Sequence, residues 1–111
     1  MSSAQRLAQS QLDAYNRGDI EAFAACYAPD VEVFLQSGEL LYRGVETLRE
    51  KYGPYFQANP NLHAALLSRM VQGSFAIDHE HVTGLTSGDE VFAIAIYEVA
   101  DDLIQKVWFI K

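Results

Sequence analysis

Four ionisable side chains near the middle of the chain could carry chemistry together: His63, Arg69, Asp78 and Glu80. They lie in two stretches rich in apolar and β-branched residues, on either side of Gln72-Gly73. This dipeptide is typical of a tight hairpin turn, because glycine readily adopts a positive φ. Side chains alternate along a strand, so a loop made of these two residues places all four ionisable groups on one face of the hairpin.

The chemistry that such a face could perform is proton transfer. Asp78 and Glu80 are two residues apart, which holds two carboxylates roughly 5–8 Å from each other on a strand. In a cavity, desolvation and mutual repulsion raise the pKa of one of them, leaving one acid and one base. Arg69 could keep the other carboxylate ionised, and His63 could shuttle a proton.

The alternative interpretation of these four residues is a solvated or salt-bridged rim on the outer face of the sheet. The pocket interpretation is favoured because small and apolar residues share the predicted face: Ala65, Leu67, Ala76 and Val82.

The opposite face of the hairpin carries His79 and His81. Two histidines on a strand without a third ligand indicate a metal only weakly, so we expect neither a metal nor another cofactor. This face is too apolar to be left in water, which predicts a homodimer formed sheet to sheet, with histidine at its margin. The apolar residues assigned to it are Leu66, Ile77, Phe92, Ile94 and Ile96. Whether Trp108 joins them depends on the length of the turn at Asp101-Asp102 and is left open.

Composition bounds the class of protein. The chain of 111 residues predicts one domain, 1–111, and half of the residues are hydrophobic, as in a globular protein. A formal net charge of −7 argues against nucleic acid and against an anionic membrane surface as partners. The single cysteine, Cys26, excludes an internal disulfide, and no signal core or membrane-spanning run is seen, so a cytoplasmic location is expected.

Hydrophobic periodicity predicts three helices followed by long strands. The first helix starts after Ser2 or Ser3 and stops at Gly18, and the second is capped by Asp19 and ends before Pro29. The third follows Gly44 and ends at Asn59, with a kink or break at Gly53-Pro54. Strands are expected over 31–35, 39–42, the two arms of the 61–85 hairpin, 90–99 and 103–110.

This order of elements predicts an α+β fold in which a curved, mostly antiparallel sheet wraps around the three N-terminal helices. Such a cone leaves a cavity suited to a small hydrophobic molecule. Four tyrosines come from helices that should cover it, although ordinary core packing predicts the same residues. They are Tyr15, Tyr27, Tyr52 and Tyr55.

Several segments resemble the nuclear-transport-factor-2-like (NTF2-like) superfamily, in particular its small bacterial SnoaL-like and ketosteroid-isomerase-like members. They are the stretch from Ala14 to Phe23, that from Tyr27 to Val33, Arg43-Gly44, and the stretch from Ile94 to Val99 with Asp102-Leu103-Ile104. The resemblance implies the conical fold over nearly the whole chain. It leaves function open, because this fold hosts isomerases, cyclases, hydrolases and dehydratases as well as non-catalytic dimers.

The resemblance also implies where enzymes of the superfamily would carry their catalytic groups. The ketosteroid isomerase positions fall at Leu35, Gln11 and Ala95, none of which matches, so steroid isomerisation is not expected. The epoxide-hydrolase positions fall at Asp78, Glu80 and Phe109, and only the acid at Glu80 is kept. Leu35, Ala95 and Phe109 are therefore expected in the pocket. The functions predicted are acid/base catalysis of isomerase, hydratase or cyclase type, or alternatively a non-catalytic ligand-binding or dimerisation module.

Overall fold

A computed structural model describes residues 2–111, and its three helices begin at the predicted signals. The first and third also end where predicted, whereas the second ends at Ala24, well before Pro29. Helix α1 spans Ser3–Arg17, where the Ser2 side chain accepts a hydrogen bond from the Gln5 N–H and Gly18 ends the helix at a φ of 66°. Helix α2 spans Ile20–Ala24 and is capped by the Asp19 side chain. Helix α3 spans Val45–Ala58.

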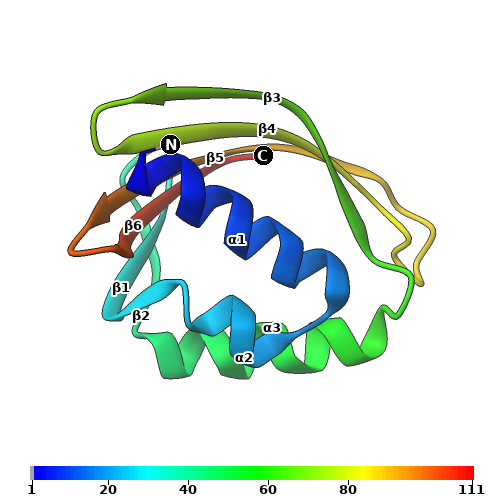
Figure 1. The fold of residues 1–111 in the computed structure, drawn as a ribbon. Helices are drawn as coiled ribbons and strands as arrows, with labels where there is room; N and C mark the ends of the chain where they lie inside the picture. Colours follow the sequence, from blue (N-terminus) through cyan, green and yellow to red (C-terminus); the bar gives the residue numbers. More distant parts are fainter. Residues whose placement is uncertain (1) are drawn as a thin grey trace.

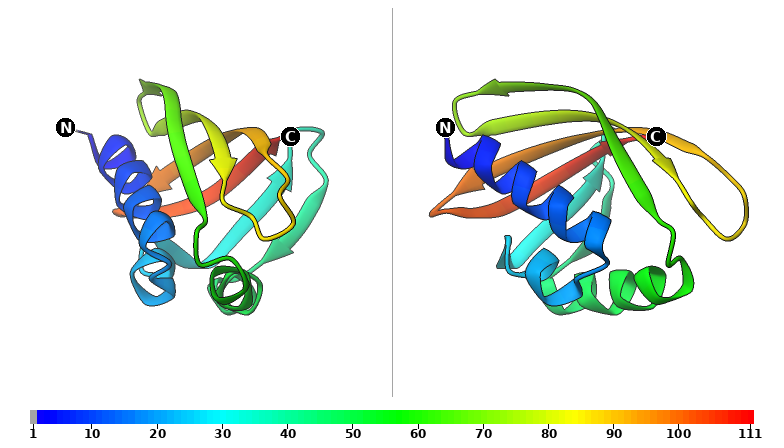
Figure 2. Two further views of the ribbon diagram at one scale, coloured as in Figure 1. Left: turned by 90° about the vertical axis from the view of Figure 1, so that its right-hand side faces the viewer. Right: turned by 45° about the vertical axis from the view of Figure 1, so that its right-hand side comes forward.

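The six strands form one curved, unclosed sheet with the order β2-β1-β6-β5-β4-β3 (Figure 1). All neighbouring strands are antiparallel except β1 and β6, which are parallel. The strands are β1 (Tyr27–Leu35), β2 (Leu40–Arg43), β3 (His63–Gln72), β4 (Phe75–Thr83), β5 (Val91–Ala100) and β6 (Leu103–Ile110). The sheet curls over the helices in both views of Figure 2, so the predicted α+β cone is confirmed.

Helix α3 differs from the prediction in running past Gly53-Pro54 to Ala58 without a break. Proline removes one main-chain hydrogen bond. The last turn nevertheless buries Phe56, which is 6% exposed, and this burial offsets the loss. Strand β1 also begins four residues earlier than predicted, so Tyr27 comes from this strand rather than from the second helix.

The long hairpin of β3 and β4 departs from the predicted pairing in two places. Its turn is Gly73-Ser74, so Arg69 lies directly opposite Asp78 rather than diagonal to it. Further along, Ser68 pairs with His79 and Leu66 with Glu80, which leaves Leu67 as an extra residue in a β-bulge. One extra residue exchanges the two faces for everything beyond it.

The bulge corrects the predicted faces of three residues. Ala65 pairs with His81 and lies on the outer face, not on the face of Asp78 and Glu80. His63 pairs with Thr83 and is exposed, away from the face that carries Asp78 and Glu80. Leu66 lies opposite Glu80 rather than in the row of Ile77 and Phe92.

The last hairpin settles the position of Trp108. Asp101 and Asp102 form a two-residue turn with φ of 55° and 58°. The register then pairs Trp108 with Ile96. The indole stacks on Phe34 with ring centroids 5.6 Å apart. Trp108 therefore lies on the outer face.

Candidate functional site

A cavity of about 570 Å³ lies between the helices and the concave face of the sheet. Most of its walls are aromatic or aliphatic, and its volume is in the range of small-molecule sites. The residues that line it are Gln11, Leu12, Tyr15, Phe23, Tyr27, Leu41, Tyr42, Lys51, Tyr52, Tyr55, Ala64, Glu80, Val82, Val91, Ala93, Tyr97, Phe109 and Lys111.

The tyrosines of this cavity are neutral hydrogen-bonding groups. Burial is the main cause that raises the pKa values of Tyr15, Tyr27, Tyr52 and Tyr97, and it raises the pKa of Tyr42 to about 12. The Tyr15 and Tyr55 hydroxyls are 3.1 Å apart. Their O–H groups can donate to a ligand oxygen, and their rings supply apolar walls.

Glu80 is the one carboxylate among the lining residues. It points inward from β4 and is 9% exposed, and among residues 2–111 no hydrogen bond reaches its carboxylate. Burial raises the pKa of Glu80 to about 7, the Asp78 charge raises it further, and the Arg69 charge opposes the rise. A carboxyl group with that pKa exchanges its proton readily near neutral pH.

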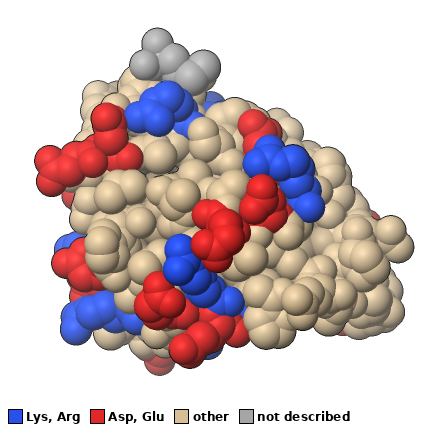
Figure 3. Space-filling view, turned by 60° about the horizontal axis from the view of Figure 1, so that its bottom comes forward, with Lys and Arg blue, Asp and Glu red and all other residues tan. Residues whose placement is uncertain are grey.

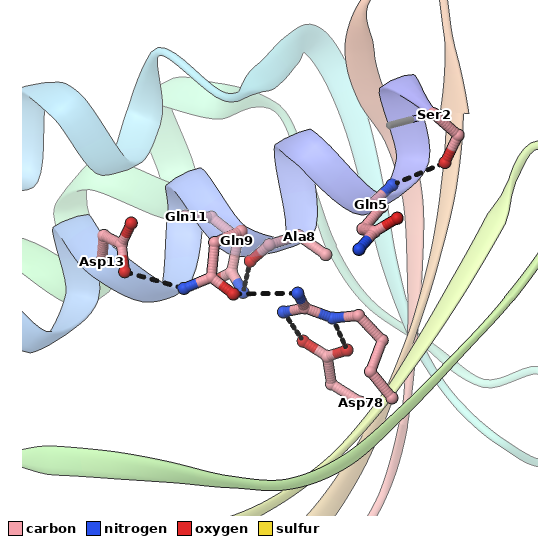
Figure 4. Close-up of polar contacts among 8 residues, drawn as sticks. Ser2, Gln5, Ala8, Gln9, Gln11, Asp13 and Asp78 are labelled. Atoms are coloured by element: carbon pink, nitrogen blue, oxygen red, sulfur yellow. Dashed lines mark hydrogen bonds and ion pairs between the residues drawn. The ribbon is translucent and has the colours of Figure 1, made fainter.

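Asp78 lies two residues earlier on β4 and is completely buried. Arg69 binds it through two hydrogen bonds, Nε to Oδ1 at 2.7 Å and Nη2 to Oδ2 at 2.9 Å. The remaining Nη1 donates to Gln9 Oε1 on α1 at 2.9 Å, and Gln9 Nε2 donates to Asp13 at 2.8 Å. This chain of contacts ties the hairpin to the helix (Figure 4).

The two acids therefore have different surroundings. Asp78 has its bidentate guanidinium partner, which satisfies both of its carboxylate oxygens. Glu80 has a hydrophobic cavity and a neighbouring negative charge, both of which favour its protonated form. Of the residues predicted to form the polar end of the pocket, only Glu80 faces the cavity, since neither Asp78 nor Arg69 lines it.

The remaining predicted residues fall into two groups. Tyr15, Tyr27, Tyr52, Tyr55 and Phe109 line the cavity. Leu35 and Ala95 do not, and His63 lies outside it. Ala95 is fully buried opposite Asp78, and Leu35 pairs with Phe109 at the end of β1.

The sequence did not predict several lining residues, among them Gln11, Tyr97, Lys51 and Lys111. The resemblance marks Gln11 only as a position where a ketosteroid isomerase group is missing. Gln11 accepts a hydrogen bond from the Tyr27 hydroxyl at 3.3 Å. The signal for Tyr97 was available, because it follows Ala95 by two residues on a strand and so shares its inner face. No pattern in the sequence marked the lysines, since their place depends on how α3 and the end of β6 meet at the cavity.

Among the histidines of the outer face, His81 contacts other side chains. His81 Nε2 lies 2.9 Å from Glu90 Oε1, and its ring stacks on Phe92 at 4.2 Å. Within residues 2–111, no three His, Cys, Asp or Glu side chains are grouped as a metal site. No helix in the same range has the length and hydropathy needed to cross a membrane.

Comparison with known proteins finds a match to the family described as "SnoaL-like domain" over residues 8–107. Curated proteins gave no match. Among solved structures, an uncharacterized cystatin-fold protein from Novosphingobium aromaticivorans superposes with a TM-score of 0.88 at 25% identity, covering 100% of this chain and 99% of that one.

Two further structures have names that mention an activity. A candidate polyketide cyclase from Sinorhizobium meliloti has a TM-score of 0.79 at 21% identity, covering 99% of this chain and 100% of its own. A candidate ketosteroid isomerase from Kribbella flavida has a TM-score of 0.75 at 26% identity, covering 96% of this chain and 76% of its own. At 21% identity, the likeness to the Sinorhizobium protein shows a shared fold alone.

Proposed function

The chain belongs to the SnoaL-like domain family, within the NTF2-like superfamily, and on that basis we propose that it is an acid/base catalyst for a small hydrophobic molecule. The observation that carries the proposal is the Glu80 carboxyl group. It lines the cavity without a hydrogen-bond partner among residues 2–111, and its pKa is about 7.

In this proposal Glu80 is the catalytic residue and removes a proton from the bound molecule. The proton passes from a carbon or oxygen of the ligand to the Glu80 carboxylate and returns to another atom of the ligand. A transfer of this kind within the ligand is an isomerisation or a cyclisation. In a hydration, Glu80 would instead take the proton from a water molecule whose oxygen adds to the ligand, and would return that proton to the neighbouring ligand atom. If negative charge develops on an oxygen of the ligand, that oxygen can accept hydrogen bonds from the tyrosine hydroxyls that line the same cavity.

Asp78 and Arg69 act as positioning residues in this scheme. Their buried ion pair fixes a negative and a positive charge beside Glu80, and both charges affect its pKa. The names of the Sinorhizobium and Kribbella proteins, a cyclase and an isomerase, are consistent with proton-transfer chemistry in such a cone. The ketosteroid isomerase mechanism itself is not proposed, because Leu35 and Ala95 stand where its acids would be.

The test compares Glu80→Gln with Glu90→Gln, an isosteric change at an exposed glutamate outside the cavity. Compounds that stabilise the wild type in a thermal-shift screen are assayed for binding and turnover. We expect Glu80→Gln to lower affinity or rate at least about tenfold, or 1.4 kcal/mol, while Glu90→Gln changes neither. Equal behaviour of the two variants would contradict the proposal.

A ligand that binds in the cavity and is never converted would support the second interpretation, a non-catalytic binding module. An enzyme and a binding module would use the same cavity. Single-turnover analysis, which measures whether the bound compound is converted to product, distinguishes the two functions.

The assembly proposed is a homodimer of a single-domain, cytoplasmic protein. Aromatic and aliphatic side chains continue across the outer face of the sheet, where Met70 and Phe92 are 65% and 59% exposed. Apolar exposure of this extent on a sheet face is typical of a protein interface.

A further inference from the structure

Two of the three lysines in the chain, Lys51 and Lys111, line the cavity that contains Glu80. Both are exposed, so they lie where the cavity opens to solvent. The Lys51 ammonium lies over the Tyr42 ring at 5.1 Å, and the Lys111 ammonium over the Phe109 ring at 5.0 Å. These rings line the cavity too, and cation–π attraction keeps both ammonium groups at its rim.

The two ammonium groups lack carboxylate partners in a strongly acidic protein. Each of the five arginines lies within 4.0 Å of a carboxylate, and among residues 2–111 neither Lys51 nor Lys111 does. Acidic and basic side chains are interspersed on the face that α2 and α3 cover (Figure 3). With 15 acidic residues in the chain, two exposed cations without a carboxylate partner among residues 2–111, both on the lining of one cavity, leave positive charge free for a ligand.

The sheet register sets the span between these cations and Glu80. Glu80 pairs with Ala93 on β5, and Ile94 pairs with Ile110 on β6. Lys111 is therefore level with Ala93, two strand spacings or about 10 Å from Glu80 on the same inner side. The walls between them are largely aromatic, so a ligand that reaches from one to the other has an apolar body.

We propose that the ligand is an aromatic or polycyclic anion whose carboxylate-like group binds Lys51 and Lys111 while its ring system extends toward Glu80. This inference rests on the proposed function for the role of Glu80 and adds the class of substrate. The anionic group stays at the wet opening, where its desolvation is small, and the uncharged end enters the hydrophobic cavity.

The probes are 2-naphthoate and 2-naphthamide, which share a ring system and differ in charge. Binding is measured by calorimetry at pH 8 and low salt in the wild type and in the double variant Lys51→Met/Lys111→Met. Methionine keeps an apolar stem on each ring. The control is Lys106→Met, which removes a positive charge from a lysine outside the cavity.

We expect the wild type to prefer 2-naphthoate about fivefold, in line with the attraction of two exposed charges. The double variant should lose this preference without a change in its affinity for 2-naphthamide, and Lys106→Met should keep it. Salt at 0.5 M, on the order of five times the usual ionic strength, should reduce the preference in the wild type.

Equal affinity of the wild type for both probes, no binding of either, or an undiminished preference in the double variant would overturn the inference. A preference lost equally in Lys106→Met would do the same, since it would reflect net charge alone. None of these results changes the effect of Glu80→Gln on ligands found by screening, so the failure of this inference is distinguishable from failure of the proposed function.

Discussion

Asp78 and Glu80 are both carboxylic acids and lie on the same strand and the same side of the sheet. Their surroundings nevertheless differ, because Asp78 is held in an ion pair and Glu80 faces the cavity. The Arg69 guanidinium reaches Asp78 through two hydrogen bonds and has its remaining contact with Gln9. Glu80 is then left with the cavity as its surroundings. A fixed charge pair beside a carboxyl of raised pKa is a common way for a protein to obtain a base that works near neutral pH.

The raised pKa of Glu80 predicts a particular dependence of stability on pH. Its pKa is about 7 in the folded protein and near 4.5 in the unfolded chain, so the folded state binds the proton more tightly. The free energy of unfolding therefore falls as pH rises from about 4.5 to 7, by roughly 3 kcal/mol from this group, and levels off above that.

Glu80→Gln should remove this contribution, so the variant should gain stability relative to wild type at pH 8 but not at pH 4. Urea unfolding of both proteins across this range measures the difference, in which the other titrating groups cancel. Parallel curves would contradict the raised pKa of Glu80.

The ion pair beside Glu80 predicts pKa changes of opposite sign in two variants. Asp78→Asn removes a negative charge and should lower the pKa of Glu80, whereas Arg69→Met removes a positive charge and should raise it. Carbon-13 NMR of the glutamate carboxyl groups measures both. Each variant breaks a buried pair and should cost about 3–5 kcal/mol of stability, so the titrations are done well below the unfolding temperature.

At the scale of elements, the sequence predicted the strands and the turn more accurately than the faces. The observed turn, Gly73-Ser74, lies one residue later than the predicted one. This changes the cross-strand partner of Arg69, but Arg69 and Asp78 stay on the same face of the hairpin. The bulge at Leu67 exchanged the faces beyond it and carried His63 outside. Nothing in Leu66-Leu67 marks a bulge, because it arises from the curvature of the sheet over α1.

The loop after β4 packs against the residues just before β3 at Gly84, where no side chain fits. Gly84 has a φ of 79°, and a Cβ there would lie 1.8 Å from the Asn61 carbonyl oxygen. We expect Gly84→Ala to destabilise the protein by roughly 3 kcal/mol or more. Gly88→Ala is the control, since Gly88 has a φ of 84° and open space around it, and it should cost about 1 kcal/mol. Urea unfolding compares them, and equal losses would show that the close approach is absent.

At the scale of the whole molecule, periodicity and capping signals predicted the order of helices and strands, because each element's signals are local. The resemblance to the NTF2-like superfamily implied the same conical arrangement that the order of elements predicted. The contents of the cavity were only partly predictable. Tyr15, Tyr52 and Tyr55 could be assigned from helical spacing, whereas Lys51 within α3 and Lys111 just after β6 line one cavity only because the fold brings these separate segments around it.

The outer face of the sheet leads to the prediction about assembly. Ile77, Ile96 and Trp108 lie side by side across β4, β5 and β6, and Phe92 is stacked on His81 farther along. Neither helices nor loops cover this face in Figures 1 and 2 for residues 2–111. A second copy of the chain would bury it, with a total interface above about 1,000 Å².

Sedimentation should therefore give a dimer at micromolar concentration, and Phe92→Asp should give a folded monomer, because a charge within an apolar interface is buried without a partner. Leu41→Asp is the matched control. Leu41 is similarly apolar and 41% exposed, but it lines the cavity rather than the outer face, so the variant should stay dimeric. A wild type that sediments as a monomer would refute the interface, and dissociation of both variants would place it elsewhere. If the dimer forms as expected, the cavity of each protomer opens away from the contact, and ligand affinity should not depend on protein concentration.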